Sequence, residues 1–241
     1  QEDDTEKTFE VPDDIVDVLF SIDCKHLPVD HACALSAALK NAVPWLAEDP
    51  GVGVHTVHVA GSQNGWERPE HGSDQDLVVS RRTKLTIRVP KARMDELMED
   101  LKGKTLDIAG RPLKVREGKI RPLSKETTLF ARYVAARPEQ TEEAFLTWAA
   151  DELHKVGIRM RKAMCGKDTP LSTPDGIVHT RSLMLADLSA EESIRLQQTG
   201  LGPRRDMGCG IFIPHKGIDS VKKSGARSEE RRVGKECRSR W

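Results

Sequence analysis

The chain has 241 residues, with 38 basic and 38 acidic side chains, 37% hydrophobic residues and 4% aromatic residues. This length allows one large domain or two small ones. No apolar segment approaches the roughly 18 residues that a membrane span needs, so we expect no membrane partner. The five cysteines form no CxxC pair, which argues against a zinc site and a disulfide framework. We therefore expect a cytoplasmic protein without a metal or cofactor.

Charge is unevenly distributed along the chain. Residues 1–17 hold eight acids and one base, and residues 227–241 hold six bases and three acids. The remainder is mildly basic, which permits a polyanionic partner. We expect residues 1–14 to form a disordered acidic leader. The sequence of 227–241 lacks apolar periodicity and is similar to a translated sequencing adapter, so we expect a non-native tail outside the fold.

The first half of the chain predicts a βαββαβ order. Residues 15–23 alternate apolar and polar side chains, as a strand with one buried face does. Asp30 is expected to cap a helix that carries apolar residues at helical spacing and ends before Pro44. Pro90 is expected to open a second helix that runs to Leu101. The remaining predicted strands are residues 52–60, 84–89, 106–108 and 113–115.

The second half predicts the same order of elements. Strands are expected at residues 129–135, near 160–164, at 178–186 and at 210–214, and helices at 142–156 and 190–198. The fold class is therefore α+β, with two tandem ferredoxin-like domains at 15–122 and 128–220. We expect a linker near residues 121–127.

A glycine-rich loop, GLGPRRDMGCG, spans residues 200–210 between the last helix and the last strand. It precedes a strand, so it is no dinucleotide fingerprint, and no Gly-Lys-Ser/Thr follows, so it is no P-loop. One interpretation is a flexible connection. The other is a loop whose missing side chains let a phosphodiester approach main-chain N–H groups, with Arg204 and Arg205 supplying charge.

This loop resembles the hallmark of the CRISPR repeat-processing endoribonucleases of the RAMP superfamily. The pattern is glycine, hydrophobe, glycine, five residues, then glycine, hydrophobe, glycine. The segments LPVDHACALSAAL, SRRTKLTIRVP and LSAEESIRLQQTGLGPRRDMGCGIFIP are similar to the MYXAN-type branch. The resemblance covers roughly residues 16–216. The glycines that carry it are Gly200, Gly202, Gly208 and Gly210.

The resemblance implies a protein that binds the repeat hairpin of a CRISPR precursor RNA and cuts it to release guide RNAs. It also allows other subunits of a CRISPR effector complex as partners. With 4% aromatic residues, recognition through phosphates and helix shape is favoured over base stacking. Cutting without a metal uses the 2′-hydroxyl beside the scissile phosphate as nucleophile, and a general base must take its proton.

Histidine is suited to that proton transfer near neutral pH. The resemblance places the base at His31, with His26 as the alternate base or as the acid. From the residues alone, a partly buried structural histidine is the favoured interpretation of His31, because it lies on the apolar stripe of the first helix and an isolated histidine is a weak signal. His55 and His58, three apart on a predicted strand, would lie on opposite faces and are interpreted as structural. Cys209 occupies a hydrophobe position, which favours packing over chemistry.

Three groups of basic residues are candidates for RNA contact, although charge runs are usually solvated. Arg159 and Arg161 alternate on a predicted strand and would point to one face, as a groove that follows a nucleic-acid backbone requires. The groups are Arg81, Arg82 and Lys84; Arg159, Arg161, Lys162 and Lys167; and Arg204, Arg205 and Lys216.

Two other functions stay open at this point. The first is an RNA-binding subunit of the same superfamily that holds guide RNA without cutting it. The second is a tandem ferredoxin-like regulatory module that binds a small metabolite. Only an RNA-binding protein would show a steep dependence of RNA affinity on salt.

Overall fold

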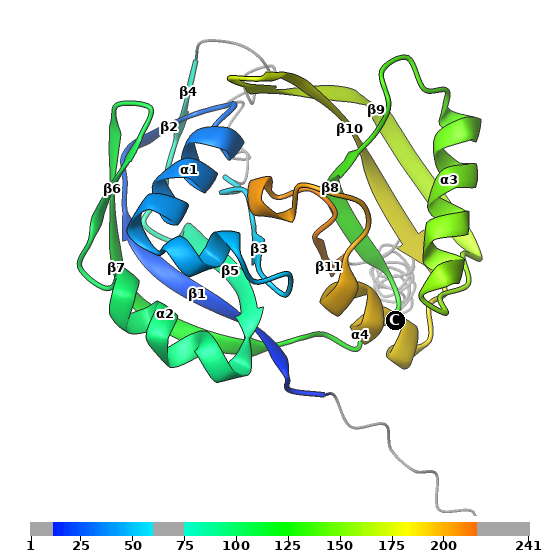
Figure 1. The fold of residues 1–241 in the computed structure, drawn as a ribbon, viewed down its shortest axis with the longest axis horizontal. Helices are drawn as coiled ribbons and strands as arrows, with labels where there is room; N and C mark the ends of the chain where they lie inside the picture. Colours follow the sequence, from blue (N-terminus) through cyan, green and yellow to red (C-terminus); the bar gives the residue numbers. More distant parts are fainter. Residues whose placement is uncertain (1–11, 60–74, 216–241) are drawn as a thin grey trace, which may run out of the picture.

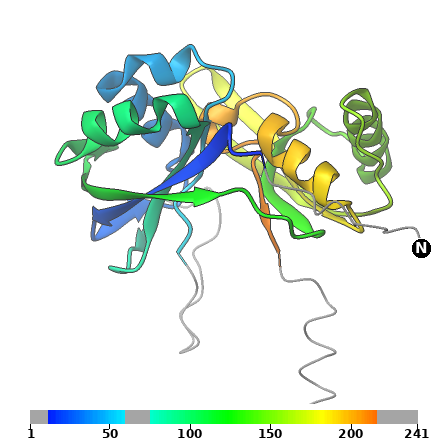
Figure 2. The same cartoon turned by 90° about the horizontal axis from the view of Figure 1, so that it is seen from below.

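The computed structural model describes residues 12–59 and 75–215. They form two antiparallel sheets that lie side by side, one from each half of the chain (Figure 1). In each half the helices cover one face of the sheet, and the opposite face carries no helix (Figure 2). The α+β class and the ferredoxin-like order of elements predicted from the sequence are confirmed.

The first sheet has the order β3-β5-β1-β7-β6, which is the ferredoxin-like order with β6 added at the edge. Every neighbouring pair in it is antiparallel. Its strands are β1 (Ile15–Asp23), β3 (Gly53–Val54), β5 (Lys84–Pro90), β6 (Thr105–Ile108) and β7 (Arg111–Pro122), and its helices are α1 (Ala32–Ala42) and α2 (Met94–Leu101), with short 3-10 turns η1 (Pro44–Ala47) and η2 (Lys91–Arg93).

Alternation along the strands separates the two faces of this sheet. Val16, Val18 and Phe20 of β1 are buried in one apolar core beneath the two helices. Asp17 and Ser21 therefore point to the opposite face, because successive side chains of a strand alternate. The same rule places Lys84, Thr86 and Arg88 of β5 on that face.

The second sheet has the order β11-β8-β10-β9 and encloses a separate core. Its strands are β8 (Leu129–Ala135), β9 (Lys162–Thr173), β10 (Gly176–Ala186) and β11 (Phe212–Pro214), its helices are α3 (Glu142–Lys155) and α4 (Ala190–Thr199), and η3 (Arg205–Met207) lies within the glycine-rich loop. Thr141 caps α3, and Ser189 with Glu192 forms a capping box on α4. The predicted strand 129–135 is confirmed to the residue.

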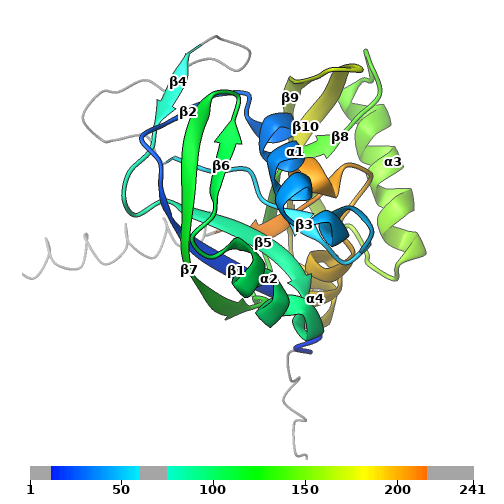
Figure 3. The ribbon, with the colours of Figure 1, turned by 60° about the vertical axis from the view of Figure 1, so that its left-hand side comes forward.

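A small third sheet was not predicted. It pairs β2 (His26–Pro28) with β4 (Asp76–Val78) at the edge of the first sheet, beside β6 and β7 (Figure 3). Arg111 of β7 binds the Asp76 carboxylate through two nitrogens, at 3.1 and 2.8 Å. Strands of three residues fall below the length at which alternation is recognisable.

Several predicted boundaries were wrong. Asp30 does not cap α1: the N-cap is His31, without a side-chain cap, and the Asp30 carboxylate instead accepts a hydrogen bond from the Ser172 N–H of β9, 2.8 Å away. The predicted strand 52–60 is reduced to Gly53–Val54. The strand predicted near 160–164 begins at Lys162, so Arg159 and Arg161 precede it. Also, β7 continues into the segment predicted as a linker.

The two halves meet through the glycine-rich loop, drawn in orange between α4 and β11, which lies against α1 (Figure 1). Asp206 of this loop accepts hydrogen bonds from Lys40 and Ser36 of α1, at 2.5 and 3.2 Å. Ala32 of α1, Tyr133 of β8 and Leu171 of β9 share a small buried cluster with Met207 and Cys209 of the loop. The loop therefore forms part of the contact between the halves.

Candidate functional site

A cleft of about 360 Å³ lies between the two halves and is lined by both. Its lining combines two histidines and three cations with a short apolar wall. Cations beside histidines suit the binding of a phosphodiester and proton transfer near it. The residues are His55, Thr56, His58, Lys84, Thr86 and Arg121 from the first half, and Arg132, Gly208, Ile211, Ile213 and Pro214 from the second.

The His55 side chain is only 13% exposed, and its backbone N–H donates to the Thr86 carbonyl, 3.1 Å away. Its Nε2 is 3.4 Å from an Asp17 oxygen. Burial lowers the pKa of His55 below its usual range, although the neighbouring Asp17 opposes this shift. His55 is therefore neutral at neutral pH.

Asp17 connects this histidine to two arginines. Arg88 binds its carboxylate through Nε at 2.8 Å and Nη2 at 3.2 Å, and Arg121 donates to it at 3.1 Å. Burial alone would raise the pKa of Asp17, but Arg88 and His55 outweigh it and hold the pKa well below its ordinary value. The carboxylate therefore stays ionised and contacts two residues of the cleft lining, His55 and Arg121.

His58 is exposed and lines the same cleft. The sequence-based argument that His55 and His58 occupy opposite faces of one strand was wrong, because β3 ends at Val54 and residues 55–59 are not a strand. Both imidazoles therefore reach one cleft. No local sequence pattern predicts this arrangement, because the path of residues 55–59 is set by hydrogen bonds to partner residues that are distant in sequence.

His31 is one of those partners. It is 3% exposed, its Nδ1 lies 2.9 Å from the Pro28 carbonyl, and its Nε2 accepts a hydrogen bond from the Val57 N–H at 2.9 Å. This network assigns the proton to Nδ1. Both ring nitrogens are engaged with the backbone, an arrangement that matches the structural alternative for His31. The predicted base thus holds the segment that carries His55 and His58.

His26 lies elsewhere. It is exposed on β2, where it pairs with Val78 of β4, and it lines a separate hollow with Asp23, Arg111 and Lys114. The structure does not bring His26 and the cleft histidines into one pocket.

The glycine-rich loop packs against protein backbone. A Cβ at Gly208 would lie 3.1 Å from the Thr56 nitrogen and 3.2 Å from the Val54 oxygen, and a Cβ at Gly210 would lie 2.1 Å from the Leu201 oxygen. The N–H groups of Gly208 and Gly210 already donate to the carbonyls of Arg205 and Tyr133. At these two positions the structure differs from the predicted approach of a phosphodiester. Gly200 and Gly202 also have positive φ.

The other residues of the loop have different environments. Arg204 is exposed and its Nε lies 3.3 Å from Asp206. Arg205 is largely buried, and its Nη1 donates to the Pro50 carbonyl at 3.2 Å. Burial, followed by repulsion from Arg88, lowers the pKa of Arg205 to about 10. Cys209 is fully buried, which confirms that it packs in the core, and this burial raises the pKa of its thiol to about 12.

The remaining predicted RNA contacts that belong to the described residues lie outside the cleft lining. Arg161 donates to Glu192 at 2.6 Å, and the Arg159 N–H donates to the same carboxylate at 3.1 Å, so both support the start of α4. Lys162 forms an ion pair with Asp187, and Lys167 is exposed on β9. Arg81 and Arg82 are exposed in the turn before β5, and Lys216 lies outside the described residues.

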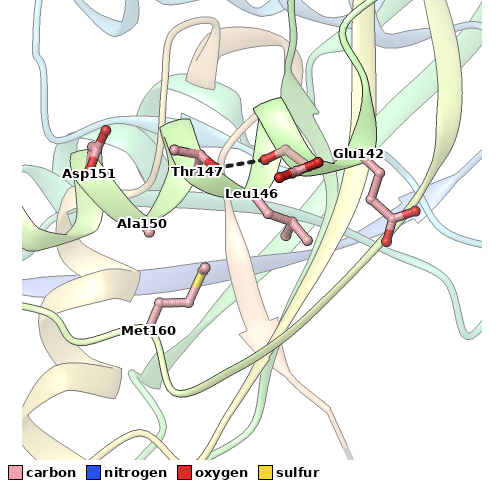
Figure 4. A pocket seen from close by; sticks show the side chains of 7 residues that line it. Glu142, Leu146, Thr147, Ala150, Asp151 and Met160 are labelled. Carbon is pink, nitrogen blue, oxygen red and sulfur yellow. Dashed lines mark hydrogen bonds between the residues drawn. The ribbon is translucent and has the colours of Figure 1, made fainter.

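A second hollow is lined by one face of α3 and by Met160, and its apolar residues are Leu146, Ala150 and Met160 (Figure 4). Its charged residues are Glu142, Glu143 and Asp151, which would repel a phosphodiester. Across residues 12–59 and 75–215, no cluster of three His, Cys, Asp or Glu side chains is placed to hold a metal ion. No helix in that part of the chain is both long and apolar enough to cross a bilayer.

Comparison with known proteins agrees with the resemblance. Residues 16–217 match the Cas6 family, described as Cas6 Crispr. A protein named CRISPR-associated endonuclease Cas6, from Myxococcus xanthus (strain DK1622), is 32% identical over 199 residues, which is 83% of this chain and 81% of that protein.

Solved structures share the fold at low sequence identity. One titled "CRISPR associated protein Cas6" has a TM-score of 0.61 at 12% identity, covering 84% of this chain and 100% of that one. A Cas6-related protein from Pyrococcus furiosus has a TM-score of 0.55 at 12% identity, covering 83% and 98%. The family match and the Myxococcus relative together show that this chain belongs to the Cas6 family of CRISPR-associated proteins.

Proposed function

We propose that this chain is an endoribonuclease that binds the repeat hairpin of CRISPR precursor RNA and cleaves it by 2′-hydroxyl attack without a metal. The observation that carries the proposal is the cleft, where both halves contribute cations around His55 and His58. The Myxococcus relative, named an endonuclease, supports the same reaction class.

In this mechanism the scissile phosphate lies against Lys84, Arg121 and Arg132. Arginine and lysine stabilise phosphoryl oxygens by charge-assisted hydrogen bonds, and they do so most strongly as negative charge develops in the transition state. Arg121 and Arg132 come from different sheets, so a phosphate held by both would depend on the relation between the halves. Recognition through phosphates predicts a steep loss of affinity with rising salt.

We assign proton transfer to His58, because it is the exposed imidazole of the cleft. It would take the 2′-hydroxyl proton as that oxygen attacks the adjacent phosphorus, and the 5′-oxygen of the next nucleotide leaves after receiving a proton. His55, which is neutral and lines the same cleft, is the second candidate for this role. The sequence-based assignment to His31 or His26 stays a prediction and is tested with variants below.

The decisive experiment uses the cognate repeat hairpin as substrate. The upstream product should end in a 2′,3′-cyclic phosphate and the downstream product should begin with a 5′-hydroxyl. Cutting should persist in EDTA and stop when the nucleotide before the scissile bond is 2′-deoxy. Efficient cutting of the deoxy substrate would refute the mechanism, because no internal nucleophile would remain. A hairpin that is bound but never cut would identify a non-catalytic RNA-binding subunit.

A further inference from the structure

A row of apolar side chains crosses the second sheet. Phe130 of β8 pairs with Met184 of β10 on one side and with Ile213 of β11 on the other, and Met184 pairs in turn with Met164 of β9. Directly opposed residues of antiparallel strands project from the same face. The four side chains therefore form one continuous row.

This row lies on the face that the helices leave open (Figure 2). Leu129 and Ala131, the chain neighbours of Phe130, are buried in the core beneath α3 and α4. Phe130 therefore projects from the opposite face. Met164 at the end of the row is 56% exposed, and the other three side chains are partly exposed. Contiguous exposed apolar side chains of this kind mark binding surfaces.

The chemistry around Phe130 suits a nucleobase. The ring of His215 lies 5.7 Å from the Phe130 ring, centroid to centroid, and is tilted by 55°. The Arg132 guanidinium lies 6.0 Å from the Phe130 centroid. An aromatic ring beside an arginine is the combination on which unpaired bases stack, since the ring contacts the base and the cation contacts its phosphate.

The row is also continuous with the cleft, because Ile213 of the row lines the cleft, as does Arg132, whose guanidinium lies beside Phe130. An RNA strand that leaves the cleft along the cations would pass directly onto Phe130. We propose that Phe130 stacks an unpaired nucleotide adjoining the repeat hairpin, and that this open sheet face is a binding site for single-stranded RNA. The inference rests on the proposed function and adds a site for a part of the RNA outside the hairpin.

The test compares the hairpin alone with the hairpin carrying a short single-stranded extension, on the 5′ side and on the 3′ side separately. All RNAs carry a 2′-deoxy nucleotide at the cut site, and fluorescence anisotropy gives each Kd at one salt concentration. One extension should tighten binding about 5- to 150-fold, the range expected for stacking of a single base. Phe130→Ala should abolish this gain and leave the affinity for the bare hairpin unchanged.

Two further variants separate stacking from apolar packing. Phe130→Tyr should keep the gain, whereas Phe130→Leu should lose it while retaining an apolar side chain. A 2-aminopurine placed in the extension should be quenched by wild type and by Phe130→Tyr only. This comparison remains informative if the alanine variant does not fold.

Three results would overturn the inference. The first is an extension that adds no affinity, and the second is a leucine variant that binds the extension as tightly as wild type. The third is a dimer in solution that Met164→Ser dissociates, because the face would then serve self-association. If the wild-type protein does not bind the bare hairpin, the proposed function is refuted, and the basis for this site is removed with it.

Discussion

The Arg88 guanidinium on β5 donates a hydrogen bond to the carbonyl oxygen of Gln197 in α4, 3.0 Å away. The same nitrogen, Nη1, donates to the Phe212 carbonyl of β11, also at 3.0 Å. Its Nε and Nη2 bind the Asp17 carboxylate, and the residue is only 1% exposed. Arg88 therefore links the two halves of the chain through buried hydrogen bonds, joining a carboxylate of the first half to two backbone carbonyls of the second half.

Replacing Arg88 with Met should destabilise the protein by about 3–5 kcal/mol, because Asp17 would remain as a buried charge without its main partner. Urea denaturation followed by circular dichroism measures this. Arg116→Met is the matched control: Arg116 pairs with the exposed Asp23, so its loss should cost less than about 1 kcal/mol. Equal effects of the two substitutions would contradict the joining role of Arg88.

Replacing His31 with Gln distinguishes a positioning role from proton transfer. The Gln side chain can accept from the Val57 N–H, but it cannot act as a base near neutral pH. If His31 only positions the segment, cutting by the Gln variant should stay within about tenfold of wild type. His31→Ala should lower the free energy of unfolding by about 1–3 kcal/mol, because it leaves the Val57 N–H unpaired. A loss of 10²- to 10⁴-fold in the folded Gln variant, on the order expected for a general base, would restore His31 as the base.

Replacing His58 with Gln should slow single-turnover cleavage by on the order of 10²- to 10⁴-fold with the melting temperature unchanged. The imidazole is exposed, so its removal leaves the core intact. Hairpin affinity should change little, since the cations remain. His26→Gln is the control for an exposed histidine outside the cleft, and normal cutting by His58→Gln would exclude this residue from proton transfer.

The stability of the protein should depend on pH through His55. Because its folded pKa lies below its ordinary value of 6.5, the unfolded state binds a proton first as pH falls, and stability is lost below about pH 6.5. Asp17 stays ionised throughout this window, since its pKa lies far lower. The unfolding free energy of His55→Gln should therefore fall less than that of wild type between about pH 7.5 and pH 5.5. An equal fall in both proteins would show that His55 does not contribute.

Replacing Gly208 with Ala tests the close approach of the loop to Thr56. Gly208 has φ +84°, and Gly103, where a Cβ would meet nothing within 4 Å, has φ +79°. Both alanine variants carry the cost of a left-handed residue, about 1–2 kcal/mol. Only the Cβ of Gly208→Ala would also clash with the Thr56 and Val54 backbone. The Gly208 variant should therefore have a lower melting temperature and cleave the hairpin more slowly than Gly103→Ala. Identical melting temperatures for the two variants would refute this contact.

The regular elements could be predicted from the sequence because their signals are local. Alternation located β1, and the strand predicted at 129–135 and the helix predicted at 190–198 correspond to β8 and α4. The candidate site could not be predicted in this way. His55 and His58 reach the cleft because the backbone of their segment is bonded to Thr86 and to the His31 ring, contacts that no periodicity encodes. Residue type also does not show which arginines are available to RNA. Arg161 is engaged with Glu192, whereas Arg132 lines the cleft, and the sequence does not distinguish these two environments.

The packing of Gly208 and Gly210 has a consequence for tracing ancestry. Gly210 lets the loop pack against its own Leu201 backbone, and Gly208 lets it pack against the Thr56 and Val54 backbone of the first half. A descendant whose His58 had been replaced would still need both glycines to assemble. The glycine signature therefore reports shared architecture, whereas the side chains of the cleft must be inspected one by one to decide whether a given relative can cleave RNA.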